Sequence, residues 1–189
     1  MTTFTVAQFL SAEAQGITLL SPVILDTSAN VAANLDALEP YAGKIGSIQF
    51  TDTGTPNLTL SATQDTDDAA VISDFLGQYS LATQNASALN AISIAGGAHV
   101  DSIAVVDTAA NIQTSLDQLE AISSEISSVT IPAVPYGSST LLSTVSISPL
   151  QLYTDLPIIK EIQSSANVYL TISGNISLSE AITALRARP

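Results

Sequence analysis

Asp26-Thr27-Ser28-Ala29-Asn30-Val31, followed by Leu35-Asp36-Ala37-Leu38, decides the fold because the chain contains this stretch twice. It returns as Asp107-Thr108-Ala109-Ala110-Asn111-Ile112, followed by Leu116-Asp117-Gln118-Leu119, 81 residues further on. Repetition at a fixed spacing indicates a structural unit that is used more than once. A unit used twice favours a building block over a single active site.

The residues around the first stretch predict a strand, a helix and a hairpin. Pro22 to Leu25 is a short apolar run, and Val31, Leu35 and Leu38 then recur at the spacing of one helix face. Asp26 or Thr27 is placed to cap that helix. Residues 45–51 and 58–61 alternate between apolar and polar side chains on either side of a segment with Gly54 and Pro56. Two alternating runs joined in this way predict a hairpin.

The second copy repeats the order of the first, with one longer loop. A second helical stripe from Ala70 to Leu76, a strand at residues 79–81 and a linking helix at residues 88–92 lead into it. Val145 then corresponds to Leu58, so the offset has grown from 81 to 87. The extra residues fall near residues 135–139, because loop tips accept insertions at little cost.

Each copy is therefore expected to contain strand, helix, strand, strand, helix, strand and a linking helix. This order predicts the α/β class, in which amphipathic helices and half-buried strands cover one another. We expect two tandem βαββαβ(α) repeats of about 80 residues that form a continuous solenoid-like stack. Two ferredoxin-like modules are the alternative. The expected divisions are a partial repeat or N-terminal cap at 1–21, repeat 1 at 22–101, and repeat 2 with a C-terminal cap helix at 102–189.

The composition excludes several classes of partner and site. Of the 189 residues, 46% are hydrophobic and only 11% are charged, and 17 acidic residues against 4 basic ones give a net charge of −13. Binding to phosphate backbones requires clustered Lys and Arg, so nucleic acid and anionic membrane surfaces are poor partners. The absence of cysteine excludes disulfides and thiolate metal sites.

The sequence leaves two cellular locations open. The first residues contain neither a basic region nor an uninterrupted apolar core, so we expect no conventional N-terminal signal peptide. No apolar run approaches the roughly eighteen residues of a membrane span, so we expect no membrane insertion. The chain is therefore either cytoplasmic or exported without such a signal. Its surplus of Ser, Thr and Ala favours an extracellular or cell-surface location.

Several stretches resemble a known class of repeat. These are residues 107–111, Leu116-Asp117, residues 48–52, and the segment Thr55-Pro56-Asn57-Leu58-Thr59-Leu60. They look like the D-T-A-A-N-V…L-D-x-L…I-T-L-T-D…P-x-L-T-L repeats of large secreted bacterial surface proteins, which are RTX or adhesin-like. The resemblance implies an extracellular, non-catalytic module that is exported without a cleaved signal. It does not extend to calcium-driven folding, because the chain lacks the G-G-x-G-x-D nonapeptide.

Acidic residues are the main candidates for a binding site. Asp65, Asp67 and Asp68 offer the oxygen ligands that Ca2+ prefers, although not at EF-hand spacing, and helix capping is the favoured interpretation. Asp36 and Asp117 occupy equivalent positions beside the apolar stripe. For these two we expect solvated side chains or hydrogen bonds between repeats rather than acid/base catalysis.

Two other side chains are candidate sites. His99 is the only histidine, and one histidine without cysteine makes no zinc site, so we expect a residue in a loop or at a strand edge. Tyr136 in the inserted loop is the aromatic side chain most suited to contact a sugar or a protein, although loop packing is the favoured role. We expect no catalytic residues and no cofactor, with Ca2+ as the one candidate.

The sequence favours a non-enzymatic structural or adhesive repeat protein that self-associates end to end into filaments or layers. The first and last elements of a linear stack have only one intramolecular neighbour, so they are the expected joints. The expected contact residues are Phe4, Val6, Phe9, Leu178, Ile182 and Leu185. A carbohydrate- or calcium-binding module, with a surface polysaccharide as partner, is the alternative. An enzyme whose site is invisible in the sequence is the third hypothesis.

Overall fold

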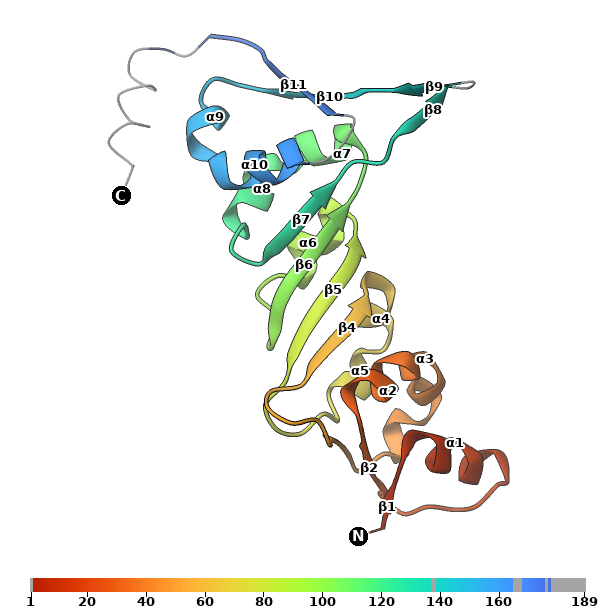
Figure 1. Ribbon diagram of the computed structural model, residues 1–189. Coiled ribbons are helices and arrows are strands. Elements are labelled where there is room, and N and C mark those ends of the chain that lie inside the picture. The colour runs from red at the N-terminus through yellow and green to blue at the C-terminus, as the bar shows by residue number, and fades with distance from the viewer. Residues whose placement is uncertain (1, 137–138, 165–167, 176, 178–189) are drawn as a thin grey trace. The chain divides into compact units, whose positions relative to one another are not determined.

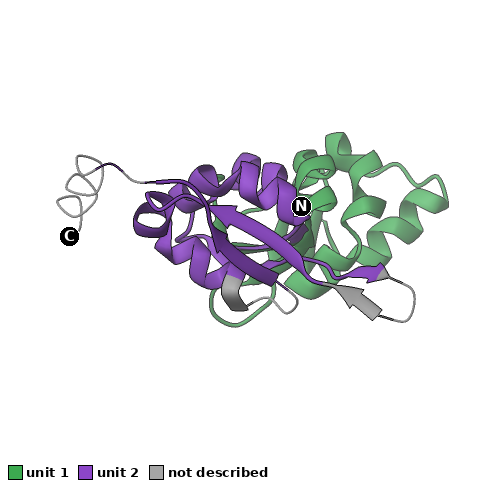
Figure 2. Ribbon diagram, turned by 90° about the horizontal axis from the view of Figure 1, so that it is seen from above, with its two compact units in different colours: residues 1–84, 97–101 green, residues 85–96, 102–189 purple. Residues whose placement is uncertain are grey.

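The computed structural model describes residues 2–136, 139–164, 168–175 and 177 (Figure 1). The chain divides into two compact units, residues 1–84 with 97–101 and residues 85–96 with 102–189 (Figure 2). Helices alternate with strands that pair mainly in parallel, which makes the fold mixed α/β. In the described part of the chain, no helix combines the length and the apolar character needed to cross a membrane.

The first unit follows strands with helices along the chain. Its first three strands form a parallel sheet in sequence order, and its next two strands pair in parallel with each other. The elements are β1 (Thr3–Phe4), α1 (Val6–Ala14), β2 (Val23–Asp26), α2 (Ser28–Ala33), α3 (Leu35–Leu38), the 3-10 helix η1 (Glu39–Lys44), β3 (Ser47–Phe50), β4 (Asn57–Ser61), α4 (Ala62–Asp67), α5 (Ala69–Ile72) and β5 (Ser80–Ala86).

The second unit also alternates helices with strands, and it contains a pair of short antiparallel strands. β6 pairs in parallel with β7, and β10 pairs in parallel with β11, whereas β8 and β9 are antiparallel. The elements are α6 (Ala88–Ile94), β6 (Val100–Val106), α7 (Ala109–Thr114), α8 (Leu116–Ala121), β7 (Ile126–Thr130), β8 (Val134–Tyr136), β9 (Ser139–Leu141), β10 (Ser143–Ile147), α9 (Gln151–Thr154), α10 (Leu156–Ser164) and β11 (Val168–Ile172).

The hairpin expected between residues 45 and 61 is wrong. β3 pairs in parallel with β2, and Ile48 of β3 also bridges to Phe75 in parallel. β4 pairs in parallel with β5 instead of folding back on β3. Alternation in sequence reports which face of a strand is buried and not the direction of its partner. The parallel pairs also differ from a ferredoxin-like module, in which the second and third strands along the chain form an antiparallel hairpin.

The helix expected from Val31 to Leu38 is interrupted at Asn34, where α2 ends and α3 begins. The side-chain amide of Asn34 donates a hydrogen bond to the carbonyl of Asn30 at 2.8 Å. The second copy has the same interruption at Ser115, between α7 and α8. The apolar stripe therefore continues across two short helices, and the break recurs at the same place in both repeats.

Apolar side chains from strands and helices form the core of each unit. In the first unit Phe75 lies edge-on to Phe50 and Tyr79, with ring centroids 5.1 and 5.3 Å away. The buried side chains of that cluster include Val6, Phe9, Ile24, Val31, Leu35, Leu38, Ile48, Leu58, Leu60, Val71 and Leu81. In the second unit they include Ile103, Val105, Ile112, Leu116, Leu119, Val129, Val145, Ile147, Ile158, Ile159 and Ile162. Both copies of the repeated stripe are core-facing.

Candidate functional site

Asp26, at the end of β2, ties together two helices. Its Oδ1 accepts hydrogen bonds from the backbone N–H of Thr27 and from the Asn30 side chain, both at 2.8 Å. Its Oδ2 accepts the backbone N–H of Val6 at 2.9 Å, which satisfies a donor in the first turn of α1. The Thr27 hydroxyl caps α2 by accepting the N–H of Asn30, as the sequence indicated.

Asp107 makes the same bonds in the second copy. It accepts from Thr108 and from the Asn111 side chain at 2.7 Å, and from the N–H of Ala88 at the start of α6 at 2.9 Å. Burial acts to raise the pKa of Asp107, but these three hydrogen bonds outweigh it and hold the pKa below its usual value of 3.8. The same balance lowers the pKa of Asp26. The repeated D-T-x-A-N motif is therefore a structural tie.

A pair of carboxyl groups lies in each repeat. In the first repeat Asp68, between α4 and α5, lies beside Asp36 of α3, and both line one cavity. In the second repeat Asp155, between α9 and α10, lies beside Asp117 of α8. Asp68 and Asp155 are each 3% exposed, and the Oδ2 atom of each receives no hydrogen bond within the described structure. Their partners Asp36 and Asp117 are exposed.

The first pair lines a polar cavity of about 580 Å³. Glu39 and Asp67 also line it, together with Pro40, Ser61, Thr63 and Gln64. Burial raises the pKa of Asp68 to about 6, and the contact with Asp36 and the charges of Asp36, Glu39 and Asp67 act in the same direction. Among the described residues, the charged groups that act on Asp68 are all acidic.

The second pair has a related environment. Burial raises the pKa of Asp155 to about 6, and the contact with Asp117 and the charges of Asp117 and Glu120 add to this effect. A hydrogen bond from the hydroxyl of Thr154 to Oδ1 of Asp155, at 2.6 Å, opposes it. The side chain of Gln151 donates to Oδ1 of Asp117 at 2.7 Å and fixes that carboxylate.

Glutamates hold the neighbouring helices in both repeats. Oε2 of Glu39 accepts the N–H of Val71 at 3.3 Å, and Oε2 of Glu120 accepts the N–H of Ile158 at 3.0 Å. The first bond connects the start of η1, directly after α3, to α5, and the second connects α8 to α10. The glutamates were not singled out in the sequence, although their spacing from Asp36 and Asp117 is the same in both copies.

The three candidate calcium ligands are only partly brought together. Asp67 and Asp68 line the same cavity, whereas Oδ2 of Asp65 accepts the hydroxyl of Thr83 at 2.9 Å. Helix α4 is capped instead by Ser61, whose hydroxyl accepts the N–H of Gln64. Among the described residues, no group of three or more Asp, Glu or His side chains is placed to hold a metal ion.

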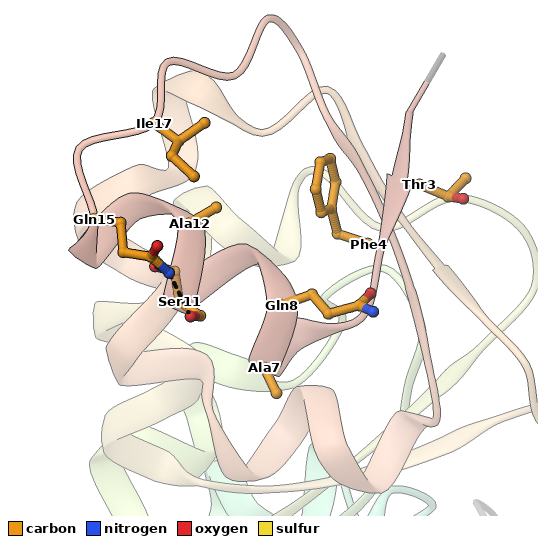
Figure 3. A pocket seen from close by; sticks show the side chains of 8 residues that line it. All are labelled: Thr3, Phe4, Ala7, Gln8, Ser11, Ala12, Gln15 and Ile17. Atoms are coloured by element: carbon orange, nitrogen blue, oxygen red, sulfur yellow. Dashed lines mark hydrogen bonds between the residues drawn. The ribbon is translucent and has the colours of Figure 1, made fainter.

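The N-terminal edge of the first unit has an open apolar pocket of about 520 Å³ between β1 and α1. Figure 3 shows Phe4 of β1 and Ile17, from the loop after α1, on two sides of it, with Ala12 of α1 between them. Ser11 of α1 is hydrogen-bonded to Gln15, the residue that follows α1. Leu20 in the same loop is 91% exposed. We call β1, the outer face of α1 and residues 15–20 the N-terminal edge.

The expected contact residues occupy different places. Phe4 lines the pocket of the N-terminal edge, whereas Val6 and Phe9 are buried in the core of the first unit and are left out of the contact proposed below. The remaining three, Leu178, Ile182 and Leu185, lie outside the described residues.

The insertion in the second repeat forms the antiparallel pair of β8 and β9. The backbone of Tyr136 lies in β8 opposite Ser139, and its side chain lies outside the described part. A cavity of about 700 Å³ borders this pair. It is lined by Thr108, Ala109, Ala110, Gln113, Thr114, Pro132, Ala133, Val134, Pro135, Leu142, Ser143 and Thr144.

His99 lies in the turn before β6, at φ 71°, and is exposed. Its ring stacks on Tyr79 with centroids 3.9 Å apart, and its Nδ1 lies 3.0 Å from the carbonyl oxygen of Tyr79. These contacts give the histidine a packing role in the turn, in line with the sequence.

No family model, no curated protein and no solved structure gives a significant match to this chain.

Proposed function

We propose that this chain is a non-enzymatic structural or adhesive repeat protein of the cell surface or extracellular space, which associates end to end through its N-terminal edge. The observation that carries the proposal is the open edge itself. β1 is hydrogen-bonded to β2 on one side, and in the described part of the chain no strand pairs with its other side. Free strand edges and exposed apolar side chains are the usual starting points for association.

The occupant proposed for this edge is a second copy of the chain. Strands follow one another in parallel and in sequence order in β1-β2-β3, β4-β5, β6-β7 and β10-β11, which supports a solenoid-like stack of tandem repeats. A further parallel strand therefore fits the free side of β1. β11 carries Tyr169 and Ile172, both 59% exposed, and is the described strand best suited to provide it.

Contact between two different ends is heterologous, so it closes into a ring or propagates as a filament according to the rotation per subunit. The repeated bonds of Asp26 and Asp107 support a scaffold function, because they connect successive helices rather than form a reactive cluster. The resemblance to repeats of secreted bacterial surface proteins supports an extracellular location.

Light scattering over a concentration series tests the proposal. Wild-type mass is expected to increase with concentration, and Ile17→Asp with Leu20→Asp is expected to hold the protein as a monomer. The matched control is Leu76→Asp with Leu89→Asp, which places the same charges at two other exposed leucines, 54% and 72% accessible. A control that dissociates as the edge variant does, or a wild type that stays monomeric throughout, would refute the proposed contact.

Carbohydrate binding is a second candidate function, favoured by the cavity beside β8. Hydroxyl and amide groups of Thr108, Gln113 and Thr144 line it together with apolar side chains such as Val134 and Leu142. Polar groups of this kind on an apolar wall are suited to a sugar face. An upward shift of the melting temperature with oligosaccharides would favour this function, and an unchanged melting temperature across a panel of them would count against it.

A further inference from the structure

The two buried aspartates present the same unsolved hydrogen-bonding problem. In the part of the chain that the structure describes, Oδ2 of Asp68 and Oδ2 of Asp155 receive no hydrogen bond, although each carboxyl group is almost fully buried. A buried acceptor without a donor is costly. Beside each lies another carboxyl group, which in its ionised form is also only an acceptor.

One proton solves this problem. When one carboxyl group of the pair is protonated, it becomes a donor, and its O–H can donate a hydrogen bond to the ionised partner. Two carboxylates in contact cannot both remain charged without strong repulsion. The partners Asp36 and Asp117 are exposed, so the proton has a route to solvent.

We infer that each repeat binds one proton between its paired carboxyl groups, Asp36 with Asp68 and Asp117 with Asp155, and that this proton is a structural ligand which stabilises the protein in mildly acidic solution. The proton resides on the buried aspartate, whose O–H donates a hydrogen bond to the exposed aspartate. Its loss leaves two repelling carboxylates between helices that otherwise pack together.

The acidic groups around both pairs act to raise the pKa of the buried aspartate. Asp68 faces Asp36 of α3, Glu39 of η1 and Asp67 of α4. Asp155 faces Asp117 and Glu120 of α8, and from α9 the neutral donor Thr154. Asp74, after α5, is a half-buried acid whose pKa is raised by burial and by the charge of Glu39.

The sign of the effect follows from the raised pKa values. The pKa of Asp68 and of Asp155 is about 6 in the folded protein, above the usual 3.8. Their contribution to stability is therefore complete below pH 3.8 and is lost as the pH rises through 6. Asp26 and Asp107 have lowered pKa values, so their contribution is lost as the pH falls below 3.8. The stability maximum is expected between these limits.

Melting temperatures of the full chain between pH 4.5 and 8 test the inference. Wild-type protein is expected to melt several degrees higher at pH 5 than at pH 7.5. In the double variant Asp68→Asn with Asp155→Asn this difference should shrink and the melting temperature at pH 7.5 should rise, because an amide supplies the donor without charge. Asp101→Asn, at an exposed position of β6, controls for the loss of one negative charge and should keep the wild-type profile.

A second variant keeps the test decisive if the buried positions do not tolerate substitution. Asp36→Asn with Asp117→Asn changes only exposed residues and should flatten the profile in the same way, because the new amides donate to the buried carboxylates. A wild-type melting temperature that is unchanged from pH 5 to pH 7.5, or a profile that both double variants retain, would overturn the inference. If millimolar Ca2+ stabilises wild type at pH 7.5 and the variants abolish this effect, the ligand of the paired carboxyl groups is a cation and not a proton, and the inference is overturned.

Discussion

In the first repeat, six residues, 51–56, connect β3 to β4, whereas in the second repeat residues 131–142 connect β7 to β10 and include the β8–β9 pair. The strands on either side of these connections keep their parallel partners in both repeats. The insertion therefore changes the surface of the second repeat without changing its framework. Loop tips tolerate such additions because loop length alone costs little free energy.

The carboxyl pairs also combine residues that are the same in both repeats with a neighbouring residue that differs. The buried aspartate, its exposed partner and the glutamate that accepts a helix N–H are present in both repeats. At the position before the buried aspartate, the first repeat has Asp67 and the second has Thr154, which donates a hydrogen bond to Asp155. The comparison indicates that the carboxyl pair is common to both repeats, whereas the residue that precedes the buried aspartate differs between them.

The largest expected effect comes from the equivalent core leucines. Leu35→Ala and Leu116→Ala each remove a fully buried side chain, so each should lower the free energy of unfolding by about 2–5 kcal/mol. Urea unfolding followed by circular dichroism measures both. Leu89→Ala, at an exposed position, is the control. A large loss of stability in one of these variants with none in the other would contradict the structural equivalence of Leu35 and Leu116.

A smaller effect is expected from the repeated tie. Asp26→Ala or Asp107→Ala removes three hydrogen bonds and leaves a helix N–H without its acceptor, which should cost about 1–3 kcal/mol at neutral pH. The lowered pKa values predict that this contribution disappears as the pH falls below 3.8. The variants and wild type should therefore converge in acid. A difference from wild type that stays constant from pH 7 down to the lowest pH at which the protein remains folded would show that hydrogen bonding by the ionised form is not the cause.

Shortening the insertion should have less effect. Replacing residues 132–142 by a loop of the length of residues 51–56 should change the free energy of unfolding by about 0.6 kcal/mol or less. Urea unfolding of this variant beside wild type measures the change. A loss comparable to that of Leu116→Ala would mean that β8 and β9 support the core of the second unit.

The smallest effect is expected from calcium removal. Oδ2 of Asp65 is bonded to Thr83, so the three clustered aspartates do not act as one ligand set. A chelator should leave the melting temperature of wild type at pH 7.5 unchanged. A fall of several degrees, restored by Ca2+, would revive the calcium-binding alternative.

The sequence allows the local elements to be predicted better than their partners. The D-T-x-A-N motif indicates the strand and the helix cap because both depend on neighbouring residues, and Thr27 caps α2 as expected. The hairpin failed because parallel pairing joins segments far apart, such as Ile48 with Phe75. The contact between Asp36 and Asp68 is not evident from the sequence, because Asp36 lies in α3 and Asp68 lies between α4 and α5. Their joint recurrence as Asp117 and Asp155 was the signal that could have connected them.

Electron microscopy of the purified protein tests the central claim of a self-associating structural subunit most directly. Filaments or closed rings built from a repeated subunit are expected for wild type, and their loss is expected for Ile17→Asp with Leu20→Asp. Particles of uniform monomer size at every concentration, in wild type and variant alike, would contradict the claim.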